Sequence, residues 1–382
     1  MSRPMGAESG RSRELPVGPV GRRDLFFCGV QLAVLQMSDL FRVGIDPGWK
    51  GAFESLLSSH VRDVFDSRPD IEWEIMAPPV GGAASPEVID QYDGLVILGM
   101  PFSAHSFEGV KRLACISRWG VGFDMIDIAA AGAADVMVAL TPEAIKRSVA
   151  ESQIALIFAL AKCLPALDRR TRAGIWRTDL PIDGIDVKGR ALSSVGLGRI
   201  GAEMFRMARG IGFGRLLAYD PYCSESLARD VGVDLVSLET VMSEGDFVTV
   251  NAFLNAETRG MIGAAELALM KPSAYFVNTA RGPIVDESAL VQVLRDRRIA
   301  GAGLDVFEKE PPAEDNPLLA MDNVILSPHS MAWTQEGMAG NSRDACRNIA
   351  SVASGEVPPC LADPAVANQE GVQAKLARWR KS

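Results

Sequence analysis

The chain contains few of the residues that build metal centres and disulfide frameworks. Among its 382 residues there are three histidines and six cysteines, and no two cysteines have the spacing of a CxxC pair. The histidines, His60, His105 and His329, lie far apart in the sequence. Scattered cysteines in a chain of this length indicate reduced thiols. The sequence therefore predicts a cytoplasmic protein that holds no metal ion.

The chain also lacks an excess of basic residues and a long apolar run. It has 39 basic and 48 acidic side chains, with a net charge of −9. No apolar stretch reaches the length of about 20 residues that a membrane-spanning helix needs. Neither nucleic acid nor a membrane is therefore expected as a partner. Apolar residues make up 48% of the chain, and a chain of this length favours two domains, each with its own core.

Residues 1–40 are interpreted as an N-terminal extension. Residues 1–24 are rich in Gly, Pro, Ser and Arg, a composition typical of a disordered tail. Arg22-Arg23 precede the apolar residues 25–30, which is a weak likeness to a twin-arginine export signal. Gln31 and Gln36 interrupt the apolar stretch, and no AxA cleavage site follows. These features favour a frayed extension over an export signal.

Strand and helix patterns alternate along the rest of the chain. Four strand patterns cover residues 41–45, 71–75, 94–98 and 113–117. Thr141-Pro142 then marks the start of a long helix that runs to about Leu164 and suits a connection between two domains. Alternation of this kind predicts an α/β fold with two doubly wound parallel sheets. The second sheet is predicted from strand patterns at 191–195, 216–219, 247–250, 275–278, 303–306 and 324–326.

A GxGxxG motif stands between the first strand and the first helix of the second predicted sheet. In Gly196-Leu-Gly198-Arg-Ile-Gly201, the first glycine permits a tight turn and the second lets a pyrophosphate approach the backbone. The third glycine lets the helix pack closely on the strand. The helix N-terminus offers unpaired N–H groups to the phosphates. The motif predicts a Rossmann dinucleotide site, in which Arg199 and Ile200 also contact the cofactor.

Asp220 indicates which dinucleotide binds. It ends the next predicted strand, nineteen residues after Gly201, which is the spacing of a carboxylate that binds the adenosine ribose hydroxyls. A carboxylate at this place repels a 2′-phosphate, and no arginine follows within residues 221–223. The sequence therefore favours NAD over NADP.

Several further motifs follow the predicted strands and helices. They are Gly120-Val-Gly-Phe-Asp124, Val149-Ala-Glu151, Met270-Lys-Pro272, Val277-Asn-Thr-Ala-Arg-Gly-Pro-Ile-Val-Asp286, Gly301-Ala-Gly-Leu-Asp-Val-Phe-Glu-Lys-Glu-Pro311 and Ser327-Pro-His329.

With the glycine motif, these segments resemble a known family, the D-isomer-specific 2-hydroxyacid dehydrogenases. The resemblance runs from about residue 41 to about residue 355. It implies a flavodoxin-like substrate domain (41–140 plus 331–360) and an NAD-binding domain (141–330), with a cleft between them and a C-terminal tail (361–382). It also implies a homodimer that uses the helix from Pro142 to Leu164.

Three side chains in these motifs have the chemistry to reduce a 2-oxo acid. Arg281 and His329 each follow a predicted strand, at the carboxyl ends where α/β sheets bind ligands. A guanidinium can hold the substrate carboxylate, and an imidazole titrates near neutral pH and suits acid–base work. Glu310, placed beside His329, would orient the imidazole ring and favour its protonated form. The resemblance assigns the same roles, and it predicts hydride transfer between NAD and a small 2-oxo or D-2-hydroxy acid.

The resemblance also implies the remaining contacts to the cofactor. Asp305 would hold the nicotinamide amide, and Ala252, Thr279 and Ala280 would line the cofactor site.

The substrate side of the site is predicted from the loop 99–102 and from Trp333. The loop is expected to donate backbone N–H groups to the substrate carboxylate. Pro101 has no N–H, so the donors would be Gly99, Met100 or Phe102. Trp333 either lines an apolar substrate pocket, together with Met100, Phe102 and Met331, or packs between the two domains. An apolar pocket would exclude phosphorylated substrates.

Two alternative functions stay open. Asn251 stands where most relatives have histidine, as it does in formate dehydrogenases. Those enzymes pair the catalytic histidine with glutamine, whereas this chain has Glu310, which disfavours formate. The second alternative is an NAD-sensing corepressor-like protein of the same fold, because a fold does not determine function and such proteins can retain Arg281, Glu310 and His329.

Overall fold

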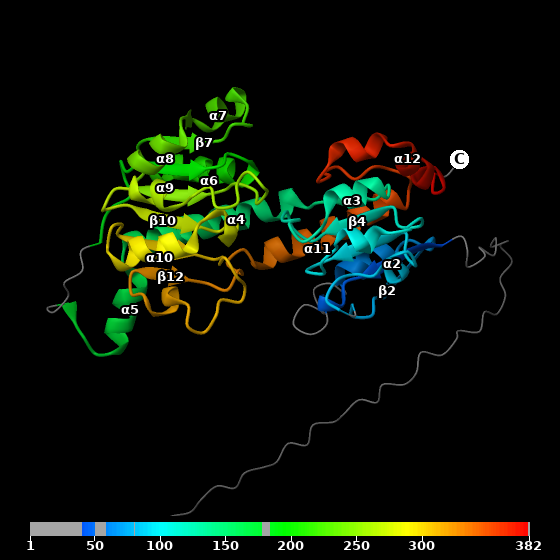
Figure 1. Cartoon of the computed structure of the whole chain (residues 1–382), viewed down its shortest axis with the longest axis horizontal. Helices are drawn as coiled ribbons and strands as arrows, with labels where there is room; N and C mark the ends of the chain where they lie inside the picture. The colour runs from blue at the N-terminus through cyan, green and yellow to red at the C-terminus, as the bar shows by residue number, and fades with distance from the viewer. Residues whose placement is uncertain (1–39, 50–58, 80, 178–183, 381–382) are drawn as a thin grey trace, which may run out of the picture. The chain divides into compact units, whose positions relative to one another are not determined.

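The computed structural model describes residues 40–49, 59–79, 81–177 and 184–380 (Figure 1). These residues form two parallel β-sheets, of five and seven strands, with helices packed on them. The predicted α/β fold with two doubly wound sheets is confirmed. The predicted extension, apart from Leu40, and the twin-arginine segment lie outside the described residues.

The first sheet has the strand order β2-β1-β3-β4-β5, and all of its strands are parallel. β3 is buried along its whole length and β4 along all but its last residue, as expected where both faces of a sheet are covered. Short helices connect the strands. The elements are β1 (Phe41–Ile45), η2 (Pro47–Trp49), η3 (Arg62–Asp66), β2 (Ile71–Ile75), α2 (Pro86–Ile89), β3 (Gly94–Ile97), η4 (Ala104–Phe107), β4 (Cys115–Arg118), α3 (Ile128–Ala133) and β5 (Met137–Ala139).

Two long helices carry the chain between the two sheets. α4 (Pro142–Ala161) begins at the predicted proline and leads from the first sheet into the second. α11 (Gln335–Val352) returns the chain and packs its buried face on β3 and β4. The two helices approach closely, because a side chain on Gly340 would contact Ala144 at 3.1 Å. The hydroxyls of Ser148 and Thr334 also lie 3.0 Å apart.

The second sheet has the order β12-β11-β10-β9-β6-β7-β8, again entirely parallel. The change of direction in strand order at β6 and β9 places the carboxyl ends of these strands at a topological switch point, where such sheets bind ligands. The elements are α5 (Leu164–Arg172), β6 (Leu192–Val195), α6 (Arg199–Ile211), β7 (Leu216–Tyr219), α7 (Glu225–Val231), β8 (Asp234–Leu235), α8 (Leu238–Glu244), β9 (Phe247–Val250), α9 (Ala264–Ala268), β10 (Tyr275–Asn278), η6 (Gly282–Ile284), α10 (Glu287–Arg295), β11 (Gly301–Leu304), η7 (Pro317–Ala320) and β12 (Val324–Leu326).

Two predicted strands are shifted in the structure. β4 covers Cys115–Arg118 and begins two residues after the start of the predicted 113–117. β11 covers Gly301–Leu304, two residues before the predicted 303–306. The small residues of this strand give no alternating pattern that would mark its ends. They are required by packing, because a side chain on Gly303 would press on Leu156 of α4 at 3.2 Å.

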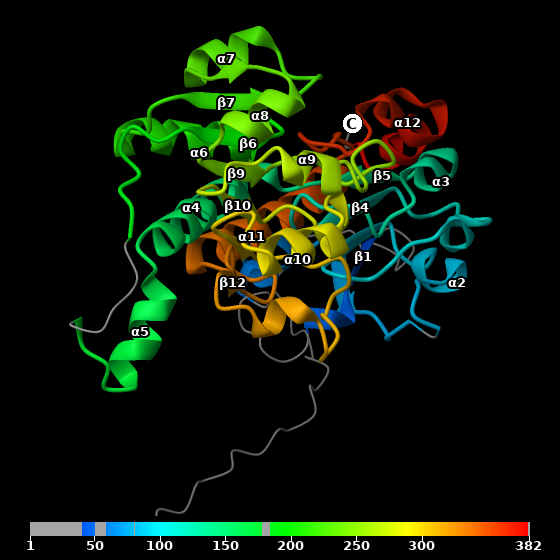
Figure 2. The same cartoon turned by 60° about the vertical axis from the view of Figure 1, so that its left-hand side comes forward.

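The C-terminal segment, predicted as a tail at 361–382, packs on the first sheet in the part that the structure describes. Leu361 pairs with Ala139 of β5 in an antiparallel bridge. After η8 (Pro364–Asn368), α12 (Glu370–Ala377) lies beside α3, as both views show (Figure 1, Figure 2). Val372 and Leu376 of α12 are buried in the core of the first sheet. The segment therefore forms part of the helical layer on this sheet.

Within the described ranges, no single helix has the length and apolar character of a membrane span. α4 and α5 meet these criteria of length and composition only when taken together, across a bend of 59°.

Candidate active site

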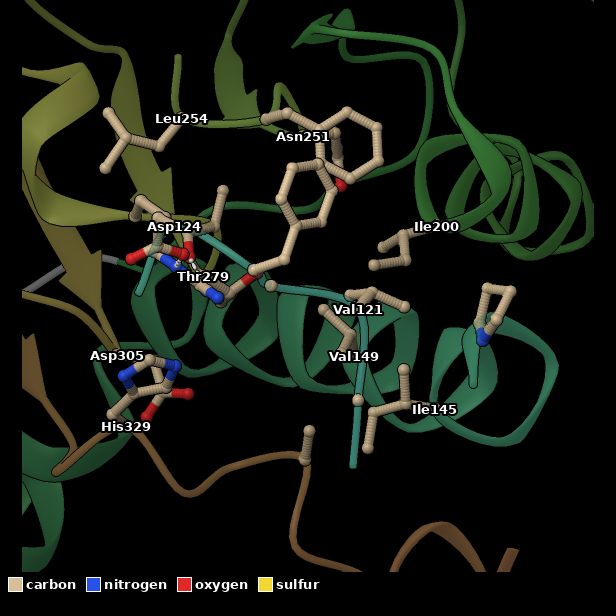
Figure 3. A pocket seen from close by; sticks show the side chains of 18 of the residues that line it. Val121, Asp124, Ile145, Val149, Ile200, Asn251, Leu254, Thr279, Asp305 and His329 are labelled. Carbon is tan, nitrogen blue, oxygen red and sulfur yellow. Dashed lines mark hydrogen bonds and ion pairs between the residues drawn. The ribbon is translucent and has the colours of Figure 1, made fainter. Parts of the chain in front are cut away.

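A cavity of about 550 Å³ is lined by residues of both sheets. On the side of the first sheet its walls come from the segment after β4, and on the other side from the carboxyl ends of β6, β9, β10, β11 and β12. In Figure 3, Val121, Ile145 and Val149 gather at one end, away from His329 and Asp305. Ten predicted site residues line the cavity: Gly198, Arg199, Ile200, Ala252, Thr279, Ala280, Arg281, Asp305, His329 and Trp333.

His329 and Glu310 form a hydrogen-bonded pair. Nδ1 of His329 lies 2.7 Å from Oε2 of Glu310, and the other carboxylate oxygen accepts the N–H of Phe307 at 3.1 Å. Burial opposes ionisation of Glu310, but the hydrogen bond and charge of His329, followed by the Phe307 N–H, outweigh it and lower the pKa of Glu310. The ionised carboxylate therefore accepts the proton on Nδ1, and Nε2 is the ring nitrogen left for a ligand.

Asp305 shapes the loop that carries His329. Its Oδ1 accepts the Ser327 hydroxyl at 2.6 Å and the Ser330 N–H at 3.0 Å, and Asp305 is 4% exposed. His329 has a φ of +51°, in the left-handed region that non-glycine residues seldom adopt. The carboxylate holds the chain on both sides of this residue, so it stabilises the backbone conformation that points the imidazole at the cavity.

Arg281 lies at the end of β10 and reaches across to the first sheet. Its Nε donates to Asp124 Oδ1 at 2.9 Å, and its Nη1 donates to the carbonyl of Ala280 at 2.7 Å. Burial opposes ionisation of Asp124, but the charge and hydrogen bond of Arg281 outweigh it and lower the pKa of this carboxyl. The guanidinium packs against Gly122 so closely that a side chain there would collide with Nη2.

The glycine motif has the geometry of a dinucleotide cradle. Gly196 has a φ of +99°, and a Cβ on it would lie 2.6 Å from the backbone nitrogen of Ala252. Gly198 precedes α6, and no atom lies within 4 Å of the place where its Cβ would be. A Cβ on Gly201 would approach the Gly196 carbonyl at 3.2 Å. The open space above Gly198, at a helix N-terminus, fits a pyrophosphate.

Asp220 lies beside this motif. Its Oδ2 accepts the Leu197 N–H at 2.8 Å, and its Oδ1 accepts the Tyr222 N–H at 2.9 Å. The carboxylate is thereby fixed at the carboxyl end of β7, next to the glycine turn, although it does not belong to the cavity lining. This position agrees with contact to a ribose hydroxyl of a dinucleotide laid across the turn.

The structure corrects the prediction for the loop 99–102. The N–H groups of Leu98, Gly99 and Met100 all donate to Oδ2 of Asp46, at 2.9, 2.9 and 3.0 Å. The N–H of Phe102 donates to a main-chain carbonyl at 2.8 Å. The side chains of Met100 and Phe102 are buried in the core of the first sheet instead of facing a ligand. The predicted donors to the substrate are thus already occupied within the protein.

Asn251 belongs to a buried polar network. Its amide oxygen accepts Nε2 of Gln153, from α4, at 2.8 Å, and its amide nitrogen donates to the Ser194 hydroxyl of β6 at 2.9 Å. Gln153 Nε2 also donates to the Thr279 hydroxyl at 2.9 Å. Asn251 therefore ties α4 to two strands of the second sheet, and its amide is engaged in the protein.

The two remaining histidines lie outside the cavity, whereas Trp333 lines it. His105 is exposed and pairs with Glu108 at 3.0 Å, and His60 lies 3.9 Å from Asp63. Neither lines the cavity. Trp333 lines it and is 48% exposed.

Sequence reasoning missed two residues near the cavity, Arg118 and Asp46. Arg118 is the last residue of β4 and lines the cavity. Its position directly after an apolar strand, at the carboxyl end of a parallel sheet, is the signal that would have identified it. Asp46 follows β1 in the same way, but its role depends on a contact 52 residues away in the sequence, between its carboxylate and the N–H of Leu98.

Comparisons with known proteins agree with this geometry. The model of the D-isomer specific 2-hydroxyacid dehydrogenase, NAD binding domain, matches residues 154–331. The glyoxylate reductase of Korarchaeum cryptofilum is 38% identical over 307 residues, which cover 79% of this chain and 90% of that protein. The D-3-phosphoglycerate dehydrogenase of Archaeoglobus fulgidus is 37% identical over 268 residues, which cover 70% of this chain and 50% of that enzyme.

Solved structures show the same relationship. The crystal structure of a glyoxylate reductase from Paecilomyes thermophila superposes with a TM-score of 0.72 at 27% identity, over 84% of this chain and 98% of that one. These similarities favour a 2-hydroxyacid dehydrogenase over the formate-type and corepressor-like alternatives.

Proposed function

Because this chain belongs to the D-isomer specific 2-hydroxyacid dehydrogenase family and is an NAD-dependent oxidoreductase, we propose that its cavity reduces a short 2-oxo acid of the glyoxylate class, with His329 as the acid–base group. The observation that carries the proposal is the His329–Glu310 pair, which faces the same cavity as Arg281 and the glycine motif. The match to a glyoxylate reductase, at 38% identity over 90% of that protein, supports a short acid.

The pairing of the imidazole ring with Glu310 determines which ring nitrogen gives the proton. Bound NADH supplies a hydride to the carbonyl carbon of the substrate. His329 gives a proton from Nε2 to the carbonyl oxygen, because Nδ1 is engaged with Glu310. The ionised Glu310 stabilises the imidazolium before transfer and holds the ring in one orientation. In the oxidative direction the neutral Nε2 accepts the proton.

Arg281 holds the substrate in reach of His329. The guanidinium binds the carboxylate adjacent to the reacting carbonyl and polarises that carbonyl. Its present partners, Asp124 and the Ala280 carbonyl, use Nε and Nη1, which leaves Nη2 as the nitrogen that can donate to a ligand. Binding of a carboxylate therefore requires no loss of the Asp124 contact.

The cofactor contacts are proposed residue by residue. The open backbone at Gly198, with Arg199 and Ile200 of the same turn, takes the pyrophosphate. Ala252, Thr279, Ala280 and Asp305 line the nicotinamide end, and Asp220 takes the adenosine ribose.

Replacing Asp220 with serine is expected to reduce the preference for NADH over NADPH by about 10- to 100-fold, since the repulsion of a 2′-phosphate is removed. The measurement is kcat/KM for each cofactor at a fixed 2-oxo acid concentration. Asp230 (on the same domain, at the exposed end of α7) provides the matched control, and Asp230→Ser should leave the ratio unchanged. An unaltered ratio in Asp220→Ser would remove Asp220 from the cofactor site.

The proposed reaction is tested by steady-state turnover of NADH with glyoxylate, pyruvate and hydroxypyruvate. Chiral analysis follows for the products of pyruvate and hydroxypyruvate, which have a stereocentre. The expected result is NADH oxidation with the smallest acid preferred and a D-configured product from the others. Tight NADH binding without turnover of any 2-oxo acid would contradict the proposal and favour the corepressor-like alternative.

We also propose a homodimer formed through α5 and the end of α4, in a cytoplasmic protein whose described cysteines are free thiols. α5 projects from α4 away from the strands of the second sheet in both views (Figure 1, Figure 2). None of its residues is buried, and Leu164, Ile175 and Trp176 beside it are 59%, 39% and 66% exposed. Large apolar side chains grouped on one arm are typical of a surface that a second copy covers.

The double variant Leu164→Glu, Trp176→Glu is expected to sediment as a monomer where the unaltered protein sediments as a dimer. Charges at the centre of an apolar interface oppose association. Leu319→Glu is the control, because Leu319 is 48% exposed on η7 and lies outside the arm. A monomeric unaltered protein at micromolar concentration would refute the dimer.

A further inference from the structure

The loop after β3 forms an anion-binding nest that the protein fills itself. Three successive N–H groups, those of Leu98, Gly99 and Met100, converge on one carboxylate oxygen of Asp46. The other oxygen of Asp46 accepts the Gly48 N–H at 2.8 Å, and Asp46 is 4% exposed. Successive N–H groups of this kind make a concavity for an anion at the carboxyl end of a strand. Since Asp46 satisfies all of them, the substrate carboxylate has to be held elsewhere.

Two guanidinium groups converge beside the cavity, against the same glycine. Nε of Arg118 donates to the carbonyl of Gly122 at 2.9 Å, and Nη2 of Arg281 lies where a side chain on Gly122 would be. Nη1 of Arg118 donates to the carbonyl of Trp119. The two arginines come from different sheets, Arg118 from the end of β4 and Arg281 from the end of β10. Both line the cavity.

Arg118 carries a charge that no carboxylate neutralises directly. Within the described ranges, no Asp or Glu oxygen lies within 4.0 Å of its guanidinium nitrogens, whereas Arg281 is paired with Asp124. Burial, and then the neighbouring charge of Arg281, lower the pKa of Arg118 to about 10, and the more weakly acting charges of Asp124 and Asp46 oppose this shift. Arg118 therefore remains charged at neutral pH. A partly buried cation without a paired anion is costly, and an anionic ligand between the two arginines would relieve that cost.

We propose that Arg118 is a substrate-binding residue which, together with Arg281, holds the carboxylate of the 2-oxo acid. The substrate does not bind at the backbone nest, because Asp46 already accepts its N–H groups. This inference rests on the proposed function and names how the same site recognises its substrate. Nη2 of Arg118 and Nη2 of Arg281 are the donors. The resulting site binds the carboxylate between two positively charged guanidinium groups, and not at the N–H groups of the loop after β3.

Arg118 also holds the loop 119–122 through two carbonyls, so loss of activity alone would not identify its role. The distinguishing readout is the ratio of kcat/KM for a 2-oxo acid to that for its methyl ester. The ester keeps the reacting carbonyl and removes the negative charge. A residue that binds the carboxylate affects only the acid, whereas a residue that shapes the loop affects both substrates alike.

The test compares the unaltered protein with Arg118→Gln and Arg118→Lys on pyruvate and methyl pyruvate with NADH. Arg118→Gln is expected to lower the acid-to-ester ratio by about 10- to 100-fold, mainly through KM for the acid, because a hydrogen bond to a charged group is lost. In Arg118→Lys the acid-to-ester ratio should fall less, since lysine keeps the positive charge but lacks the paired N–H donors of the guanidinium. The Kd of oxamate, an unreactive isostere of pyruvate, should rise in parallel on the NADH complex.

Equal losses on acid and ester, or an unchanged oxamate Kd in Arg118→Gln, would overturn the inference while leaving the proposed function in place. Failure of the proposed function is distinct, because the unaltered protein would then oxidise no NADH with either substrate. Asp46→Asn supplies a second arm and is expected to lower acid and ester turnover alike. A gain confined to the acid in Asp46→Asn would mean that the substrate carboxylate competes for the nest, which contradicts the inference.

Discussion

Replacing His329 with asparagine is expected to lower kcat for reduction of a 2-oxo acid by about 10²- to 10⁴-fold, the usual contribution of a positioned acid–base group. Asparagine is chosen for a structural reason. His329 has a φ of +51°, and asparagine tolerates that left-handed conformation better than most residues. The loop held by Asp305 should therefore keep its shape, and the loss should report the missing proton donor.

Two measurements separate chemistry from folding in this variant. The Kd of NADH, followed by fluorescence, should stay within about twofold of the unaltered value, because no glycine-motif contact is changed. His105→Asn is the matched control, since His105 is exposed, pairs only with Glu108 among the described residues and does not line the cavity. A kcat for His329→Asn within tenfold of the unaltered protein would show that another group supplies the proton.

Replacing Arg281 with glutamine is expected to lower kcat/KM for the 2-oxo acid by about 10²- to 10³-fold, the cost of removing one member of a desolvated, hydrogen-bonded charge pair. The effect should fall on both KM and kcat, because the guanidinium binds the carboxylate and polarises the carbonyl. The variant also leaves the Asp124 carboxylate without its ion-pair partner. Thermal unfolding should therefore accompany the kinetics, to separate a local loss from a destabilised protein.

Gly122→Ala tests the same contact without removing the charge. A Cβ on Gly122 would collide with Nη2 of Arg281, which is the flexible end of its side chain, so the guanidinium should move while the fold persists. The expected result is a fall in kcat/KM in the same direction as Arg281→Gln, with NADH binding retained. Gly210→Ala is the control, because no atom lies within 4 Å of that Cβ position in α6. An unchanged kcat/KM in Gly122→Ala would remove Arg281 from substrate binding.

The local motifs of this chain were predictable because they combine nearby residues with one physical requirement. The turn at Gly196 requires a positive φ and a close backbone contact, and the structure shows both. Arg281 and His329 were recognisable because each follows an apolar strand, and the carboxyl ends of parallel strands meet at one edge. Glu310 was expected beside His329 from the family resemblance, and the two lie 2.7 Å apart.

Other parts of the site depend on contacts that no local pattern records. The loop 99–102 had the sequence of a free N–H donor loop, but the N–H groups of Gly99 and Met100 donate to Asp46, which follows another strand. Asn251 suggested a formate-type alternative, but its hydrogen bonds to Gln153 and Ser194 show that it connects α4 to the second sheet. The packing of α12 against the first sheet was missed because its buried Val372 and Leu376 stand in a short, weakly patterned segment.

The central claim is that this cavity joins hydride transfer from NADH to protonation of a 2-oxo acid. The most direct test follows deuterium from NADH, labelled at the transferable position of the nicotinamide, into the product of glyoxylate or pyruvate reduction by mass spectrometry. The account predicts one deuterium at C2 of the hydroxy acid with the unaltered protein, and a loss of that product in step with kcat in His329→Asn. NADH bound without any labelled hydroxy acid, or a product that carries no deuterium, would contradict it.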